Sequence, residues 1–241
     1  MLKQTLLVFF SFGLYAAAQA QPLVKAKAFY NSGIELKNKN MFPEALEAFN
    51  KAIALNKKFD SAYVESALLY VNSRNFDNAI YNLNKALYIS PKMTSALIAL
   101  GMVYRYSKPN VDSALICFLK AVKTDSTNKL ALCNVAWCYN AKQDYDNAII
   151  FAVKALDIDN GYKPAYNELG HAYHITKRYE EGLVQFRKNL AVSVVDLPMY
   201  YIGMIYIELK DKESALKQYE ELKKINERSA ASLKKRIDKM Q

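Results

Sequence analysis

Small and large apolar side chains follow one another along this chain in a pattern that repeats about every 34 residues. Small residues, spaced 34, 34, 35, 34 and 33 residues apart, lie at Gly33, Ala67, Gly101, Ala136, Gly170 and Gly203. Three places later come Leu36, Tyr70, Tyr104, Tyr139, Tyr173 and Tyr206. A second small residue then follows at Ala45, Ala79, Ala114, Ala148, Gly182 and Ala215, and four places on stand Phe49, Leu83, Phe118, Ala152, Phe186 and Tyr219. The chain therefore contains six copies of one structural unit.

Each copy is predicted to form a hairpin of two helices. Spacings of three and four residues put the marked positions on one face of a helix, and each half of a unit has room for about 14 helical residues. Turn and capping residues separate the halves, in the stretches NKN (38–40), SRN (73–75), SKPN (107–110) and KQD (142–144). Pro91 ends the second unit, and the extra residue of the third falls in its turn, at Pro109.

Stacking of the hairpins is required by their apolar faces. One hairpin cannot bury its own face, whereas neighbouring hairpins together form a continuous core that needs a cap at its end. Residues 227–241 fit such a capping helix, because an apolar stripe runs through Ala230, Leu233, Ile237 and Met240. The predicted fold class is all-α.

The repeated pattern resembles the tetratricopeptide repeat family, whose unit reads W-x2-L-G-x2-Y, then A-x3-F, A and P. The stretches "LGHAYHITKRYEEGLVQF" and "ALGMVYRYSKPNVDSALICFLKA" carry the resemblance, which covers about residues 26 to 230. It departs where the leading Trp is replaced in all six units, where Gly182 and Asn189 stand for Ala, and where the terminal Pro is kept only at Pro91. The resemblance implies a right-handed α-solenoid over residues 21–226, with units at about 26–59, 60–93, 94–128, 129–162, 163–195 and 196–226.

In the resembled family the first helices of the hairpins line a concave groove that holds a peptide or a partner segment. Transferring the groove positions one by one implies the following contact residues here: Tyr30, Asn31, Ile34, Val64, Leu68, Ile98, Met102, Arg105, Tyr106, Asn134, Trp137, Asn140, Asn167, His171, His174, Tyr200, Tyr201 and Met204. Cys133 and Glu168 also fall at such positions. The Lys and Asn residues with which some family members clamp a C-terminal carboxylate are missing.

The N-terminal 20 residues have the three-part pattern of a secretory signal. Lys3 precedes an apolar run from Leu6 to Leu14, and the small residues Ala18 and Ala20 flank a polar Gln19. We expect cleavage after Ala20, because the apolar run is shorter than the roughly 20 residues of a spanning helix. An uncleaved membrane anchor is the alternative. The expected mature protein is soluble and lies in the bacterial periplasm or outside the cell.

Composition narrows the class further. With 52% apolar and 23% charged residues the chain is too apolar for disorder, and seven Gly and six Pro are too few for an all-β domain. The formal net charge is +10, but Lys alternates with Asp and Glu along most helices, apart from a weak KKR run at 234–236. A solvated surface therefore explains the charge better than a nucleic-acid partner. The alternative function that the charge leaves open is an envelope adaptor that binds anionic surfaces through its basic face.

Catalytic motifs are missing from the sequence. It contains no Gly-rich phosphate loop, no Gly-x-Ser-x-Gly and no His-Glu-x-x-His. Glu168, His171 and His174 have a spacing that can offer metal ligands, and Cys133 could act with them, so a metal- or thiol-dependent accessory protein is a second alternative. No Cys or carboxylate cluster completes a metal site, and no cofactor is expected. Cys133 and Cys138 should not pair, since five helical residues rise about 7.5 Å.

The favoured interpretation is a non-catalytic interaction module that binds a protein or peptide. The partner, the pathway and the oligomeric state are left open by the sequence.

The first prediction concerns processing. The mature protein should begin at Gln21 and fractionate as a soluble extracytoplasmic protein, because the segment before it reads as a cleavable signal. N-terminal sequencing of the native protein checks the cleavage site. Recovery of intact Met1 to Ala20 in membrane-embedded mature protein would refute it.

Overall fold

The computed structural model describes residues 21–106, 110–192 and 195–240, and within these ranges every regular element is a helix. The proposed signal segment, Pro109 and Gln241 lie outside the described residues. The chain divides into two compact units, one ending at Asn110 and one beginning at Val111. The division falls inside the third predicted repeat.

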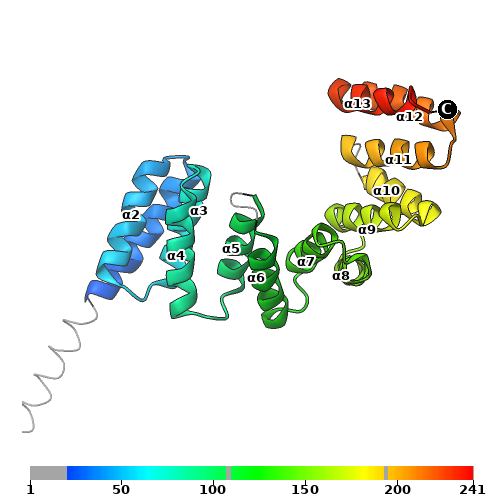
Figure 1. Ribbon diagram of the computed structural model, residues 1–241. Coiled ribbons are helices and arrows are strands. Elements are labelled where there is room, and N and C mark those ends of the chain that lie inside the picture. Colours follow the sequence, from blue (N-terminus) through cyan, green and yellow to red (C-terminus); the bar gives the residue numbers. More distant parts are fainter. Residues whose placement is uncertain (1–20, 107–109, 193–194, 241) are drawn as a thin grey trace, which may run out of the picture. The chain divides into compact units, whose positions relative to one another are not determined.

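The first unit is a row of helices in which each packs on the next (Figure 1). Residues 21–38 form its first helix. The others are α2 (Phe42–Leu55), α3 (Asp60–Asn72), α4 (Phe76–Ile89) and α5 (Thr94–Tyr106). Helix α3 contacts α5 as well as α4, so the first helices of neighbouring repeats adjoin.

The second unit repeats this arrangement over a longer stretch. Its helices are α6 (Val111–Thr124), α7 (Lys129–Ala141), α8 (Tyr145–Ile158), α9 (Lys163–Ile175), α10 (Tyr179–Val192), α11 (Asp196–Glu208), α12 (Lys212–Lys223) and α13 (Glu227–Ile237). Each packs on the next, and α7 also contacts α9, α9 contacts α11, and α11 contacts α13. Helices α7, α9, α11 and α13 therefore form one layer. The predicted all-α solenoid class is confirmed.

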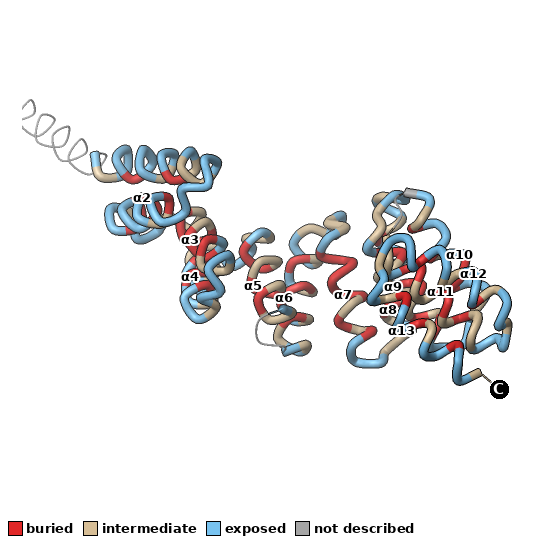
Figure 2. The backbone as a smooth tube through the Cα atoms, turned by 90° about the horizontal axis from the view of Figure 1, so that it is seen from above, coloured by how far each residue is buried: buried red, intermediate tan, exposed pale blue. Residues whose placement is uncertain are grey.

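Small residues let the two helices of a hairpin approach closely. A Cβ atom on Gly33 would lie 2.6 Å from the ring of Phe49, and one on Gly170 would lie 2.8 Å from the ring of Phe186. Both rings are fully buried and cannot swing away. Ala79 and Ala148, on the second helices, are also fully buried. Figure 2 shows such buried positions running along the helices of each unit.

In five of the hairpins, the turn ends the first helix with a left-handed residue. The φ angles of these residues lie between 59° and 62°, at Asn40, Arg74, Gln143, Lys177 and Lys210. In each case the next amide donates a hydrogen bond to the carbonyl five residues earlier, as Asp144 N does to Tyr139 O at 2.9 Å. In the third repeat Asn110 N reaches Tyr104 O, six residues back, at 3.0 Å. That longer span accommodates the predicted extra residue.

A second recurring contact is a hydrogen bond or ion pair between side chains 30 residues apart. It joins the start of a repeat to the loop that follows the second helix of the same repeat. Lys129 pairs with Asp159 at 2.5 Å, and Ser90 Oγ donates to Asp60 Oδ2 at 2.5 Å. At the last repeat Asn226 Nδ2 donates to Asp196 Oδ2 at 2.7 Å. Each bond ties the two ends of one hairpin together.

Helix α13 covers the last hairpin. The side chains of Ala230, Leu233 and Ile237 are fully buried, as the stripe in the sequence predicts, and Met240 packs beside them. A Cβ atom on Gly203 would lie 2.5 Å from Leu233 Cδ2, so α13 approaches α11 as closely as a second helix approaches a first.

The second prediction tests this close packing. Ala148→Leu should lower the free energy of unfolding by about 1–3 kcal/mol, because the added atoms have no free volume in α8. Ala54→Leu is the matched control, since Ala54 is exposed in α2 and Leu is also a good helix former. Chemical denaturation compares the two variants. Equal midpoints for both variants would mean that the crossing at Ala148 is not tightly packed.

Candidate partner-binding site

Tyr201, on α11, is the centre of a cluster of rings in the second unit. Its ring stacks on Phe186 of α10 at 5.3 Å and meets the edges of His171 and His174 of α9 at 5.7 and 5.8 Å. Tyr200 packs against it at 6.0 Å. We call His171, His174, Tyr200 and Tyr201 the aromatic wall. Three of these side chains are half-buried, while His174 is 8% exposed.

Burial sets the charge state of the wall. It lowers the pKa of His171, which the neighbouring His174 lowers further, and it lowers the pKa of His174 against the opposing pull of Glu208. Burial, assisted by the charge of Glu168, raises the pKa of Tyr201. The imidazoles of His171 and His174 and the phenol of Tyr201 are therefore uncharged at pH 7.

Amide side chains hold α7 against α9 beside the wall. Asn140 Nδ2 donates to the backbone carbonyl of Glu168 at 3.0 Å and to its Oε2 at 2.9 Å. The Oδ1 atom of Asn140 and the Nδ1 atoms of His171 and His174 are buried without a hydrogen-bond partner. These three atoms therefore have unused hydrogen-bonding capacity beneath the surface, in a region of low polarity.

The Tetratricopeptide repeat model of protein families matches residues 26–59, 60–93 and 130–162, and a second model of the same description matches residues 199–227. Together these matches cover more than half of the chain. The chain belongs to the tetratricopeptide repeat family. The matched ranges begin and end within a few residues of four of the predicted units.

Solved structures of tetratricopeptide repeat proteins share the fold. PilW, described as a widely conserved type IV pilus biogenesis factor, has a TM-score of 0.73 at 17% identity, over 82% of this chain and 92% of its own. YrrB, described as having an unusual peptide-binding site, has a TM-score of 0.65 at 22% identity, over 79% of this chain and 99% of its own. MamA has a TM-score of 0.61 at 21% identity, over 66% of this chain and 93% of its own. No curated protein matches the sequence.

Not all of the repeat positions expected to contact a partner reach the surface. Asn134 is 2% exposed and donates its amide to Leu130 O of its own helix at 2.8 Å, and Val64 is 6% exposed. Asn167 Oδ1 accepts from the buried Asn189 at 3.0 Å. Trp137 and Met204 are half-buried, and Asn140 is 7% exposed.

In the first unit the expected contact residues also differ in exposure. The ring of Tyr30 packs on Phe59 at 4.9 Å and on Phe49 at 5.7 Å, so it is partly a core residue. Tyr106 is 65% exposed, with the guanidinium of Arg105 4.9 Å from its ring centroid. The exposed set is completed by Asn31 and Leu68, and the half-buried set by Ile34, Ile98 and Met102.

Sequence reasoning did not find the residues behind the wall. Phe186 was identified only as a repeat position, and Tyr179, whose ring lies 6.3 Å from His174, was not singled out. Phe186 and Tyr201 sit on different helices, and their stacking depends on how α10 packs on α11. The sequence signal for Phe186 was its repeat position, four residues after the small residue Gly182.

Among the residues that the structure describes, no group of three His, Cys, Asp or Glu side chains is placed to hold a metal ion. Cys117, Cys133 and Cys138 are buried and none of them is in a disulfide, and burial raises the pKa of Cys117, which disfavours its thiolate. Within the same residues, no helix has both the length and the apolar character to span a membrane.

The third prediction is a pH dependence of stability. The folded-state pKa values of His171 and His174 lie below the unfolded value of about 6.5. As the pH falls through 6.5 the unfolded chain binds protons before the folded chain does, so the free energy of unfolding should fall. Urea denaturation between about pH 7 and 5.5, above the range where carboxylates titrate, measures this slope.

The control for this prediction is the double variant His171→Gln, His174→Gln. These are the only two histidines of the chain, so the double variant removes all histidine titration. Its unfolding free energy should depend less on pH over the same range. An unchanged slope in the double variant would contradict the role of the two imidazoles.

Proposed function

We propose that the chain is a non-catalytic scaffold or adaptor that binds a peptide or a segment of a partner protein along its first helices. The observation that carries this proposal is the aromatic wall, a neutral, partly exposed cluster of rings on the layer formed by α7, α9 and α11. Tyrosine and tryptophan side chains are the preferred anchors of protein interfaces. Trp137, on α7, belongs to the same layer of first helices.

The packing of the wall supports binding without rearrangement. The Tyr201 ring is held between His171, His174 and Phe186, so its orientation is set before a partner arrives. A pre-ordered surface loses less conformational entropy on binding, which favours affinity for an extended segment.

The proposal places the protein in the cell envelope of a bacterium. Its support is the signal-like pattern of residues 1–20, with cleavage after Ala20 as the expected processing step. Among proteins of the same fold, PilW is a pilus biogenesis factor and YrrB carries a peptide-binding site, so this fold is used for such roles elsewhere. The partner is then expected to be another protein of the cell envelope.

The experiment that tests the proposal starts with a photoreactive phenylalanine in place of Tyr200, expressed in the native host. Irradiation should capture a defined partner at this position. The same replacement at Tyr81, which is 58% exposed on the second helix α4, is the matched control and should capture it far less. Capture of the same proteins with equal yield from both positions would argue against a binding wall.

The fourth prediction concerns affinity for the captured partner. Trp137→Ala should weaken binding by about 2 kcal/mol, roughly 30-fold in Kd, because interface energy concentrates in a few aromatic side chains. Tyr81→Ala should leave the affinity within about twofold. Titration calorimetry measures both, and thermal unfolding checks that each variant is folded.

The alternative metal-dependent function is tested with the same partner. The double variant His171→Gln, His174→Gln keeps hydrogen-bonding side chains and should retain binding, and a chelator should have no effect on the wild-type protein. Binding that is lost in the double variant, lost with chelator and restored by zinc would replace the proposal with a metal-dependent one.

A further inference from the structure

Helix α13 continues the first-helix pattern by one more step. Its buried residues Ala230, Leu233 and Ile237 stand 31 places after Met199, Ile202 and Tyr206 of α11. By the same offset, Ser232 and Lys235 correspond to the positions of Tyr201 and Met204. The layer of first helices therefore extends onto α13, but there the aromatic and apolar side chains give way to serine and lysine.

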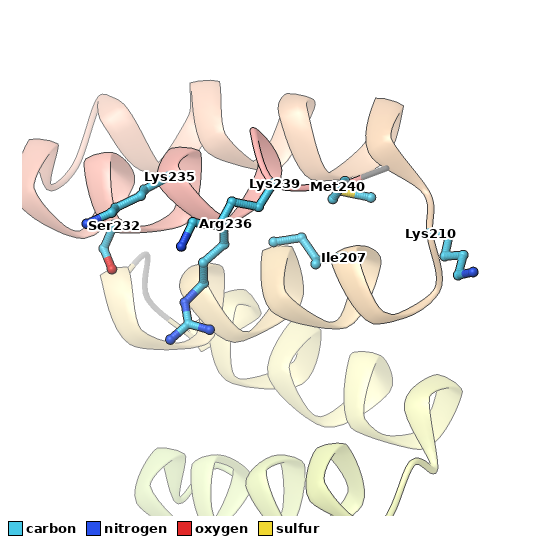
Figure 3. A pocket seen from close by; sticks show the side chains of 7 residues that line it. All are labelled: Ile207, Lys210, Ser232, Lys235, Arg236, Lys239 and Met240. Carbon is cyan, nitrogen blue, oxygen red and sulfur yellow. The ribbon is translucent and has the colours of Figure 1, made fainter.

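A pocket of about 720 Å³ lies where this layer reaches α13, and it is shown in Figure 3. We call it the C-terminal pocket; it is lined by Ile207, Lys210, Ser232, Lys235, Arg236, Lys239 and Met240. Four of the seven lining residues are cations and none is an acid. Residues 232, 235, 236 and 239 have the three- and four-residue spacing of one helix face, which explains why one short helix supplies most of the charge.

Three of the pocket cations lack a counter-charge among the described residues. In the described part of the chain, no ion pair or hydrogen bond involves the side chains of Lys235, Arg236 or Lys239, whereas the adjacent Lys234 pairs with Asp238. The three side chains are exposed, and Figure 3 shows the guanidinium of Arg236 extending from α13 toward α11. Like charges held together in one pocket repel each other, and an anionic occupant would relieve that repulsion.

The pocket also has an apolar part. Ile207 of α11 and Met240 after α13 both pack against the buried cluster around Leu233 while lining the pocket. A ligand that fits would therefore combine negative groups with at least one apolar side chain. The volume is in the range that holds a few amino-acid side chains.

We propose that the C-terminal pocket binds an acidic segment of a protein, whose carboxylates contact Lys235, Arg236 and Lys239 and whose apolar side chain lies on Ile207 and Met240. A peptide fits better than nucleic acid, because no aromatic side chain lines the pocket to stack a base. It fits better than a bilayer surface, because the basic residues line a pocket together with the apolar side chains of Ile207 and Met240. The proposal rests on the proposed function only in taking the occupant to be part of a protein.

The fifth prediction measures binding of a fluorescent probe to the full chain. The probe is a synthetic peptide of alternating Asp and Glu with one central Leu, and its counterpart carries Asn and Gln in place of the acids. By fluorescence anisotropy at low ionic strength, the acidic peptide should bind at least about tenfold more tightly than its counterpart. Added salt should weaken this binding, because the contacts are between exposed charges.

Two charge-reversal variants locate the binding site. The double variant Lys235→Glu, Lys239→Glu should raise the Kd of the acidic peptide by at least about tenfold. Lys212→Glu with Lys217→Glu makes the same change in net charge on exposed positions of α12 and should have less than about a twofold effect. If the first variant unfolds at a lower temperature than the wild-type protein, the double variant Lys235→Gln, Lys239→Gln replaces it. The expected loss of binding is then smaller. An equal loss of affinity in the α12 variant would overturn the proposed binding site, because the effect would then depend on net charge alone.

Further experiments test other ligands of the C-terminal pocket and its independence from the partner site on α7, α9 and α11. Vesicles of phosphatidylcholine and phosphatidylglycerol, and inorganic phosphate, are offered to the same variants. Pocket-dependent binding of vesicles or phosphate without binding of the acidic peptide would overturn the proposal. Trp137→Ala, on α7, should leave binding of the acidic peptide unchanged, so a failure of the proposed partner site on α7, α9 and α11 would not alter this result.

Discussion

The close contact between a small residue on one helix and a ring on the next determines the rest of the structure. At Gly33 and Gly170 an added Cβ would come within 3 Å of a buried phenylalanine ring, so the separation of the two helices is fixed by the absence of a side chain. Because contacts this close occur in the first and fifth repeats, and again between Gly203 and Leu233 of α13, hairpins of similar shape stack in register. The first helices then adjoin one another, and residues of successive repeats meet on one surface.

That layer places the aromatic wall. Tyr201 can reach two histidines of α9 and a phenylalanine of α10 only because α11 packs on both helices. The packing also accounts for the lowered pKa of the histidines, since burial among rings removes water from the imidazoles. Shape and charge state of the wall thus have one cause, which is the tight spacing of the repeats.

The periodic part of the fold was predictable from the sequence, because small and aromatic residues recur at nearly constant spacing and each position has one packing role. The helices, the turns and the apolar stripe of α13 follow from local patterns of this kind. The left-handed turn residues Arg74, Gln143 and Lys177 were not predictable from residue preference, which favours glycine there. Neighbouring helices and the hydrogen bond to the preceding tyrosine carbonyl hold these residues in place instead.

The candidate site was predictable only in part, for a physical reason. Repeat position indicates which face of a helix a residue occupies, but exposure depends on what the neighbouring repeat places above it. Asn134 has the expected position and is nevertheless buried with its amide on Leu130 O, whereas Tyr106 is open to solvent. The stacking of Tyr201 on Phe186 likewise requires the packing between repeats, which a single repeat pattern does not contain.

The end of a stacked array obeys a different constraint from its interior. A first helix inside the array must carry apolar or small residues on the sides that face both neighbours, whereas α13 has a neighbouring hairpin on one side alone in the described chain. Its free side can therefore hold Lys235, Arg236 and Lys239 without burying their charge. The same helix closes the core through Leu233 and Ile237 and offers a basic surface at the end of the layer, next to a neutral aromatic one. A bound segment long enough to run from α9 to α13 would contact rings at one end and cations at the other. The two ends of the layer thus differ in chemistry, and this difference would favour one orientation of the segment.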